Sequence, residues 1–209
     1  TGEPMKVIGL HAEILVEQVK SALSSKGYVF FDDHGPANIN IVGVRGSNVR
    51  PGKFDDMLLV IQRNTRKEWE VYSYRITTDP GDYYLRNPLK VTGTAILVPD
   101  QYRTAYTIGK HKGYTALVQH KGAVKVWRDA DKDQVLDWGH GDEYEGYYGI
   151  NIHRSRKGGE SSTVGKWSAG CQVFKNSGEF DEFMGLCADS AKKYGNGFTY
   201  TLLEQSDLV

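Results

Sequence analysis

The chain is poor in cysteine, has no excess charge of either sign and has no long apolar run. Two cysteines in 209 residues do not make a disulfide framework, and a chain of this length can bury a core without one. Lys plus Arg and Asp plus Glu both total 26, which argues against the basic surface of a nucleic-acid-binding protein. No apolar run approaches the roughly 20 residues that a membrane span needs. We therefore expect neither a nucleic-acid partner nor a membrane span.

The abundant residues favour strands and turns, with a helix near each end of the chain. Thirteen tyrosines, seven phenylalanines and four tryptophans supply bulky packing surface, and 24 glycines suit turns. Apolar residues at helical spacing over residues 10–25 predict an amphipathic helix that stops at Gly27. A last helix is predicted from Asn176, which stands at capping-box spacing from Glu179, to about Tyr194.

The segments between these helices read as strands joined by turns. Strands are predicted at YVFF, INIVGV, FDDMLLVIQR, EWEVYSYRIT, YYGINIH (residues 147–153) and FTYTLLEQ. YTALVQH and AVKVWRD are predicted to form a hairpin about Lys121 and Gly122. No internal repeat or linker is visible, so we predict a single mostly-β (α+β) domain over residues 1–209. Residues 1–90 carry the first helix and strands, and residues 91–209 carry the chemical motifs.

The two cysteines have different surroundings. Cys187 lies at helical spacing from Phe183 and Met184, which predicts a packed core residue. Cys171 follows a glycine-containing loop and opens the short apolar run CQVF, where a backbone turn leaves room for a substrate. His153 stands 18 positions earlier, and the two side chains meet if their strands pair. The alternatives are a structural Cys171 and a Cys171–Cys187 disulfide that pins the last helix.

The stretch GINIH, a polar loop and WSAGCQVF together resemble the catalytic motif of the L,D-transpeptidase (YkuD-type) domain. In that family a histidine precedes Ser/Thr-His-Gly-Cys by a loop of similar length. The resemblance covers about residues 90–175 and implies an L,D-transpeptidase-like β-sandwich or barrel. It also implies roles for four residues: Cys171 as nucleophile, His153 as base, and Ser168 and Gly170 as the residues that shape the loop. Backbone N–H groups of Gly170 and Cys171 would then hold the oxyanion.

The sequence departs from the family at two places. Ala169 stands where the family has histidine, and Gln172-Val173 replaces an apolar residue followed by Arg or Asn. These departures leave the thiol and the histidine in place but change their surroundings and the choice of acceptor.

The activity implied by the resemblance is cysteine-dependent acyl transfer on peptidoglycan stem peptides, with no cofactor for catalysis. We expect cleavage, as in a phage lysin or a delivered toxin, more than cross-link formation, which stays open as an alternative. The candidate substrate-binding residues are Arg154, Tyr148 and Trp167. Such an enzyme acts on the cell wall, in the periplasm or outside the cell, although no apolar signal segment is visible in the opening TGEPMKVIG. A non-catalytic peptidoglycan-binding module is a further alternative, with an aromatic groove formed by Trp127, Trp138, Tyr147 and Tyr148.

The segment WRDADKDQVLDWGH has the alternating carboxylates of a calcium loop. Four aspartates occupy positions 1, 3, 5 and 9 of that pattern: Asp129, Asp131, Asp133 and Asp137. Gln134 replaces the usual glycine at position 6, and His140 replaces the usual glutamate at position 12. The sequence thus predicts either a structural Ca²⁺ site or an acidic, solvated turn. The six histidines show no paired spacing that would favour zinc.

Overall fold

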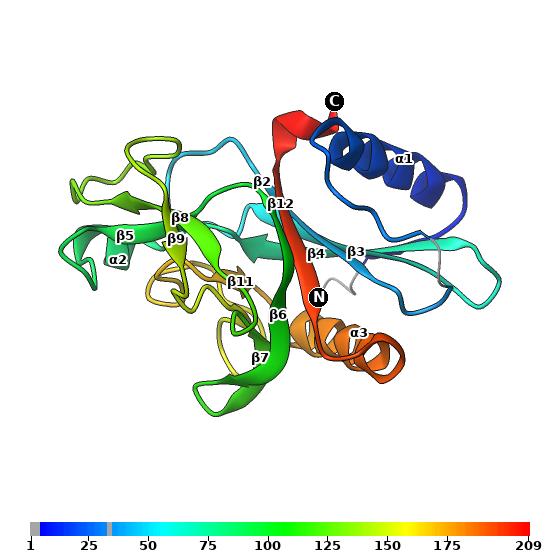
Figure 1. Ribbon diagram of the computed structural model, residues 1–209. Coiled ribbons are helices and arrows are strands. Elements are labelled where there is room, and N and C mark those ends of the chain that lie inside the picture. The colour runs from blue at the N-terminus through cyan, green and yellow to red at the C-terminus, as the bar shows by residue number, and fades with distance from the viewer. Residues whose placement is uncertain (1–4, 33–34) are drawn as a thin grey trace.

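The computed structural model describes residues 5–32 and 35–209, and most of its strands belong to one large sheet (Figure 1). In spatial order its nine strands are β1 (Met5–Val7), β4 (Trp69–Thr77), β11 (Gln172–Phe174), β10 (Ile152–Arg154), β7 (Tyr114–Val118), β6 (Gln101–His111), β12 (Phe198–Glu204), β2 (Asn40–Arg45) and β3 (Asp56–Arg63). Strand β3 pairs with β4 as well as with β2, so the sheet closes on itself. The enclosed core is rich in aromatic and branched side chains, as the composition predicted.

A smaller sheet lies to one side of the large one, at the left of Figure 1. It consists of β5 (Thr94–Leu97), β8 (Val124–Asp129) and β9 (Tyr144–Gly146), and the short helix α2 (Asp82–Arg86) lies next to β5. Leu85 of α2 is buried against Ile96 and Trp127 of this sheet and against Leu136 from the loop after β8. This sheet and its loops supply part of the candidate site described below.

Two long helices cover the large sheet. Helix α1 (Leu10–Ser25) buries one apolar face, including Val16 and Val19, against the outer side of β2, β3 and β4. Helix α3 (Ser177–Tyr194) inserts Phe180 and Phe183 into the main core. A short 3₁₀ helix, η1 (Gln205–Leu208), ends the chain. The predicted mostly-β (α+β) class with a helix near each end is therefore confirmed.

The first predicted helix has the observed bounds of α1, and the predicted cap of the last helix is also observed. The Asn176 side chain accepts a hydrogen bond from the backbone N–H of Glu179 at 3.0 Å. None of the helices in the described ranges is long and apolar enough to span a membrane.

The predicted hairpin about Lys121 and Gly122 is wrong. Strand β7 forms its hairpin with β6 instead, and β8 belongs to the smaller sheet. The tripeptide His-Lys-Gly occurs twice, and only the first copy makes the turn: Lys112 (φ 46°) and Gly113 (φ 86°) both take the left-handed conformation of a two-residue hairpin loop. In the second copy Gly122 packs directly on Ala105, so the chain crosses there from one sheet to the other.

The strand predicted over residues 147–153 is shorter than expected, because β10 begins only at Ile152. The pairing with the strand after Cys171, which was the condition for His153 and Cys171 to meet, is observed. Strands β10 and β11 lie parallel, with Ile152 opposite Gln172 and His153 opposite Val173. This pairing brings two segments 18 residues apart side by side and places both motif residues at the same region of the sheet.

Candidate active site

Cys171 lies at the end of a tight turn that leads into β11. The hydroxyl of Ser168 donates a hydrogen bond to the carbonyl of Cys171 at 2.8 Å and accepts one from the N–H of Gly170 at 3.1 Å. Gly170 has a φ of 125°, and a Cβ atom there would lie 2.6 Å from the carbonyl oxygen of Ala95. Only glycine fits this backbone, since both the conformation and the contact with β5 forbid a side chain. Ser168 and Gly170 thus shape the turn that presents the thiol.

The imidazole of His153 is almost fully buried, with 4% exposure. Its Nδ1 lies 2.7 Å from the carbonyl oxygen of Arg154. A carbonyl only accepts, so Nδ1 carries the proton and Nε2 keeps a free lone pair. Burial, reinforced by the neighbouring ring of His111, lowers the pKa of His153 to about 3. His153 is therefore neutral at physiological pH, in the tautomer that a general base requires.

A second histidine lies against the first. The ring of His111 stacks on that of His153 with centroids 4.0 Å apart and planes 13° apart. Asn151 accepts the backbone N–H of Gln119 at 2.9 Å through Oδ1, so its Nδ2 donates to His111 Nδ1 at 3.0 Å. His111 accordingly carries its proton on Nε2. Burial and the charge of Lys112 lower the pKa of His111 as well.

The sequence analysis did not predict this stack. The signal was the tripeptide His-Lys-Gly of residues 111–113 between two alternating apolar runs, which is a hairpin signature. The hairpin of β6 and β7 brings His111 and Lys112 beside β10.

The thiol of Cys171 is partly exposed, and it donates a hydrogen bond to the carbonyl of Gly149 at 3.3 Å. Burial raises the pKa of Cys171 to about 11, against opposing effects of the Asn151 backbone and the charge of Lys112. The resting site thus holds a neutral thiol and a neutral imidazole. Both cysteines are free thiols, and Cys187 is fully buried in the main core, so the disulfide alternative is wrong and the core prediction for Cys187 is confirmed.

The backbone N–H groups of the turn differ in availability. The N–H of Gly170 is bonded to Ser168, so it is not free to bind an oxyanion as the resemblance suggested. The N–H of Cys171 has no hydrogen-bond partner among the described residues, which leaves it available as an oxyanion donor.

Cys171, His153 and His111 line one pocket of about 270 Å³. The aromatic residues around it are Tyr84, Tyr148 and Trp167, and its basic residues are Lys90, Lys112, Arg128 and Lys166. None of the described lining residues is acidic. Arg154, a predicted substrate-binding residue, is not part of the lining, since its guanidinium lies 4.0 Å from the ring centre of Tyr114. The pocket is therefore positively charged, with an aromatic rim.

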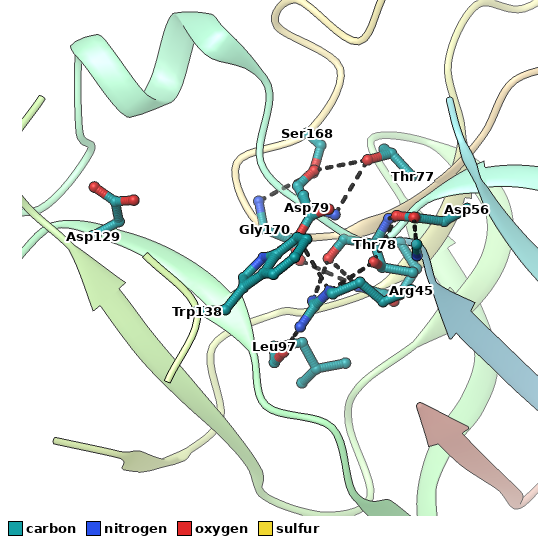
Figure 2. A network of polar contacts seen from close by, with 12 residues as sticks. Arg45, Asp56, Thr77, Thr78, Asp79, Leu97, Asp129, Trp138, Ser168 and Gly170 are labelled. Carbon is teal, nitrogen blue, oxygen red and sulfur yellow. Dashed lines mark hydrogen bonds and ion pairs between the residues drawn. The ribbon is translucent and has the colours of Figure 1, made fainter. Parts of the chain in front are cut away.

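A buried ionic network around Arg45 and Asp79 lies next to the turn that leads to Cys171 (Figure 2). Arg45 is 2% exposed, donates to the carbonyls of Leu97 and Thr78, and lies 3.2 Å from a carboxylate oxygen of Asp79. The indole N–H of Trp138 donates to the same oxygen of Asp79 at 2.9 Å. Burial raises the pKa of Asp79 to about 7.

The network reaches the turn before Cys171 through neighbouring residues. The N–H of Gly81 donates to the carbonyl of Ser168 at 3.0 Å. Gln172, directly after Cys171, accepts from the hydroxyl of Tyr200 at 2.8 Å and donates to the carbonyl of Thr78. Gln172 is fully buried, so its side chain holds β11 in the barrel and does not face the pocket.

The acidic loop brings three of its four predicted ligands together. Carboxylate oxygens of Asp129, Asp131 and Asp137 lie within 4.8 Å of one another. Asp133 is outside this group, and its Oδ1 accepts the backbone N–H of Val135 at 2.8 Å. The left-handed residue of the loop is Lys132 (φ 64°), which explains why position 6 needs no glycine.

No protein-family model, curated protein or solved structure matches the chain. The fold and the pocket define a β-rich α+β protein in which a thiol and an imidazole base share one basic cavity.

Proposed function

We propose that this protein is a cysteine-dependent acyl-transfer enzyme that acts on peptidoglycan stem peptides outside the cytoplasm and cleaves them. The observation that carries the proposal is that Cys171 and His153 line one pocket while the hydrogen bond to the Arg154 carbonyl leaves His153 Nε2 free to accept a proton. Such a pairing of thiol and base is what nucleophilic catalysis needs. The choice of peptidoglycan follows the resemblance of GINIH and WSAGCQVF to the L,D-transpeptidase motif.

The residues of the pocket have distinct roles in the proposed reaction. The sulfur of Cys171 attacks a peptide carbonyl while His153 Nε2 takes the thiol proton, and the free N–H of Cys171 stabilises the oxyanion. The same proton then passes to the leaving amine as the C–N bond breaks. Water, activated by His153, hydrolyses the thioester and restores the thiol.

The protonation states favour proton removal during attack over a preformed ion pair. The pKa of Cys171 is about 11 and that of His153 about 3, so a thiolate–imidazolium pair is unfavourable in the free protein. A substrate that displaces the hydrogen bond between Cys171 and the Gly149 carbonyl frees the thiol proton for His153.

The charge of the pocket supports an acidic peptide as substrate. Lys90, Lys112, Arg128 and Lys166 surround the thiol, and no acidic residue among those described lines the pocket. Stem peptides carry several free carboxylates close to their scissile bonds, which these cations can bind. Tyr148 and Trp167 offer apolar surface for the intervening side chains.

Cleavage is favoured over cross-linking by the residues after the nucleophile. Gln172 and Val173 are both buried, so neither contributes the charged group that the family has near this position for its acceptor. In this proposal the cations that line the pocket bind the donor peptide.

The test is incubation of the protein and of Cys171→Ala with soluble disaccharide-tetrapeptides and with cross-linked dimers, read by mass spectrometry. We expect products with the wild type and with the control variant Cys187→Ala, and none with Cys171→Ala. Release of D-alanine or of monomer from dimer establishes hydrolysis, whereas new dimers establish transfer. Equal inertness of all three proteins contradicts the proposal.

One observation favours a binding module instead. The thiol of Cys171 donates its proton in a hydrogen bond to the carbonyl of Gly149. Ala169 also stands where the family has histidine, so the site is not activated before a ligand arrives. If the wild type and Cys171→Ala bind peptidoglycan equally and neither yields product, the pocket serves binding alone.

A further inference from the structure

The loop that follows β8 has a feature independent of the thiol site. Asp129 ends β8, opposite Thr94 of β5, and it is 1% exposed. One of its carboxylate oxygens, Oδ2, accepts the backbone N–H of Asp137 at 3.1 Å. The other, Oδ1, is the buried side-chain polar atom for which the described part of the chain provides no hydrogen-bond partner. A buried carboxylate oxygen without a partner is costly, so Oδ1 of Asp129 is a candidate ligand atom.

The neighbours of Asp129 identify the kind of ligand. Oxygens of Asp131 and Asp137 lie within 4.8 Å of it and of each other, so three negative groups converge on one point. Asp131 uses Oδ1 to accept the N–H of Asp133 at 3.0 Å, which holds the loop in a shape that keeps the three carboxylates together. Three carboxylates this close to one another repel each other. A cation removes this repulsion and gives the buried oxygen a partner.

We propose that the loop over residues 129–137 binds Ca²⁺ through Asp129, Asp131 and Asp137. The group contains only oxygen donors, which suits a hard cation and disfavours zinc or copper. Two of the three carboxylates are at least partly exposed, so water can complete the six to eight ligands that Ca²⁺ takes. Mg²⁺ demands a stricter octahedron and binds more weakly at such a site.

The cation has a structural role that follows from the other contacts of the loop. The N–H of Leu136 donates to the carbonyl of Val49 at 2.8 Å, and Trp138 donates to Asp79 in the buried network. Arg128, directly before Asp129, lines the thiol pocket. Ca²⁺ therefore fixes the end of β8 and the loop that joins the smaller sheet to the Arg45 network.

Terbium luminescence tests the site without any reference to enzymatic activity. Trp127 and Trp138 flank the loop in sequence, so excitation of tryptophan should sensitise bound Tb³⁺ in the chelator-treated protein, and Ca²⁺ should quench the signal by displacement. Asp131→Asn, at an exposed position, should weaken Tb³⁺ and Ca²⁺ binding by about tenfold or more. Asp142→Asn, an exposed residue of the same connection that lies outside the group, is the matched control and should bind as the wild type.

Thermal unfolding supplies a second measurement. About 10 mM CaCl₂ should raise the Tm of the wild type and of Asp142→Asn by about 3 °C or more and leave that of Asp131→Asn unchanged. Asp129→Asn should fold without Ca²⁺ and show no response to it, because the amide removes the unpaired charge. The proposal is overturned if no sensitised emission is seen, or if the Tm of the wild type does not change with Ca²⁺ up to that concentration.

Discussion

The imidazole rings of His111 and His153 stack face to face, with centroids 4.0 Å apart. A positive charge on either ring would lie directly against the other ring. The charge of Lys112 also disfavours protonation of both histidines. Both rings are held in defined tautomers by hydrogen bonds to Asn151 and to the Arg154 carbonyl. The two rings are therefore neutral and fixed in orientation, and the lowered pKa of His153 couples the stability of the fold to pH.

Acidification should destabilise the protein through His153. Its pKa is about 3 in the folded state and about 6.5 in an unfolded chain, so only the unfolded chain takes up this proton in between. The contribution is complete above about pH 6.5 and falls by up to about 1.4 kcal/mol per pH unit below it. Urea unfolding at several pH values should show this slope in the wild type.

His153→Asn serves as the reference for that slope. Its side-chain N–H can replace Nδ1 as the donor to Arg154 but does not titrate, so the difference between the two proteins isolates the histidine and cancels the carboxylates. Parallel pH curves for the two proteins would contradict the buried, neutral state of His153.

Alkylation of Cys171 should accelerate with pH. With a pKa of about 11, only about one thiol in 10,000 is ionised at pH 7, and the rate with iodoacetamide should rise about tenfold per pH unit up to pH 10. Mass spectrometry of the labelled peptides separates Cys171 from the fully buried Cys187, which should stay unmodified in the folded protein. A rate that is constant between pH 6 and 9 would instead indicate a preformed thiolate–imidazolium pair.

Alanine at Gly170 should damage the turn. The residue would have to adopt a φ of 125° and place its Cβ against the Ala95 carbonyl, so the free energy of unfolding should fall by about 2 kcal/mol or more. Gly185, exposed within α3 and without contacts at its Cβ position, is the matched control. Gly185→Ala should increase stability by about 0.5–1 kcal/mol. Chemical denaturation measures both, and equal effects would contradict the strain at Gly170.

Removal of the buried guanidinium of Arg45 should lower the free energy of unfolding far more than neutralisation of its partner Asp79. Arg45→Met leaves Asp56 and Asp79 buried without their cation and should cost about 3–5 kcal/mol. Asp79→Asn should cost much less, because its amide oxygen still accepts from Trp138 and burial already favours the uncharged carboxyl group, whose pKa is about 7. Urea midpoints at pH 7 compare the two variants. Similar losses would show that the charge of Asp79 is needed.

The raised pKa of Asp79 makes stability depend on pH with the opposite sign to the effect of His153. Between about pH 4 and 7 the folded protein keeps a proton on Asp79 that the unfolded chain releases, so this group lowers stability as pH rises. Asp79→Asn should abolish that part of the profile.

Local patterns in the sequence were sufficient for some of these features. The amphipathic spacing over residues 10–25 and the cap at Asn176 gave both long helices, because a helix is fixed by neighbours three and four residues away. The alternating carboxylates between Asp129 and Asp137 indicated a loop that gathers oxygen atoms, because these residues are also close together in the sequence. The glycine before Cys171 indicated a turn that no other residue can make.

What depends on strand pairing was decided only by the tertiary structure. Both copies of His-Lys-Gly are locally equivalent, and the choice of Lys112-Gly113 as the hairpin depends on which strands find buried partners in the closed sheet. That choice brings His111 onto His153 and Lys112 into the pocket of Cys171, where Lys90, Arg128 and Lys166 arrive from other segments of the chain. Burial then sets the pKa values of the thiol and the imidazole, since desolvation is a property of the packed core and of no sequence motif.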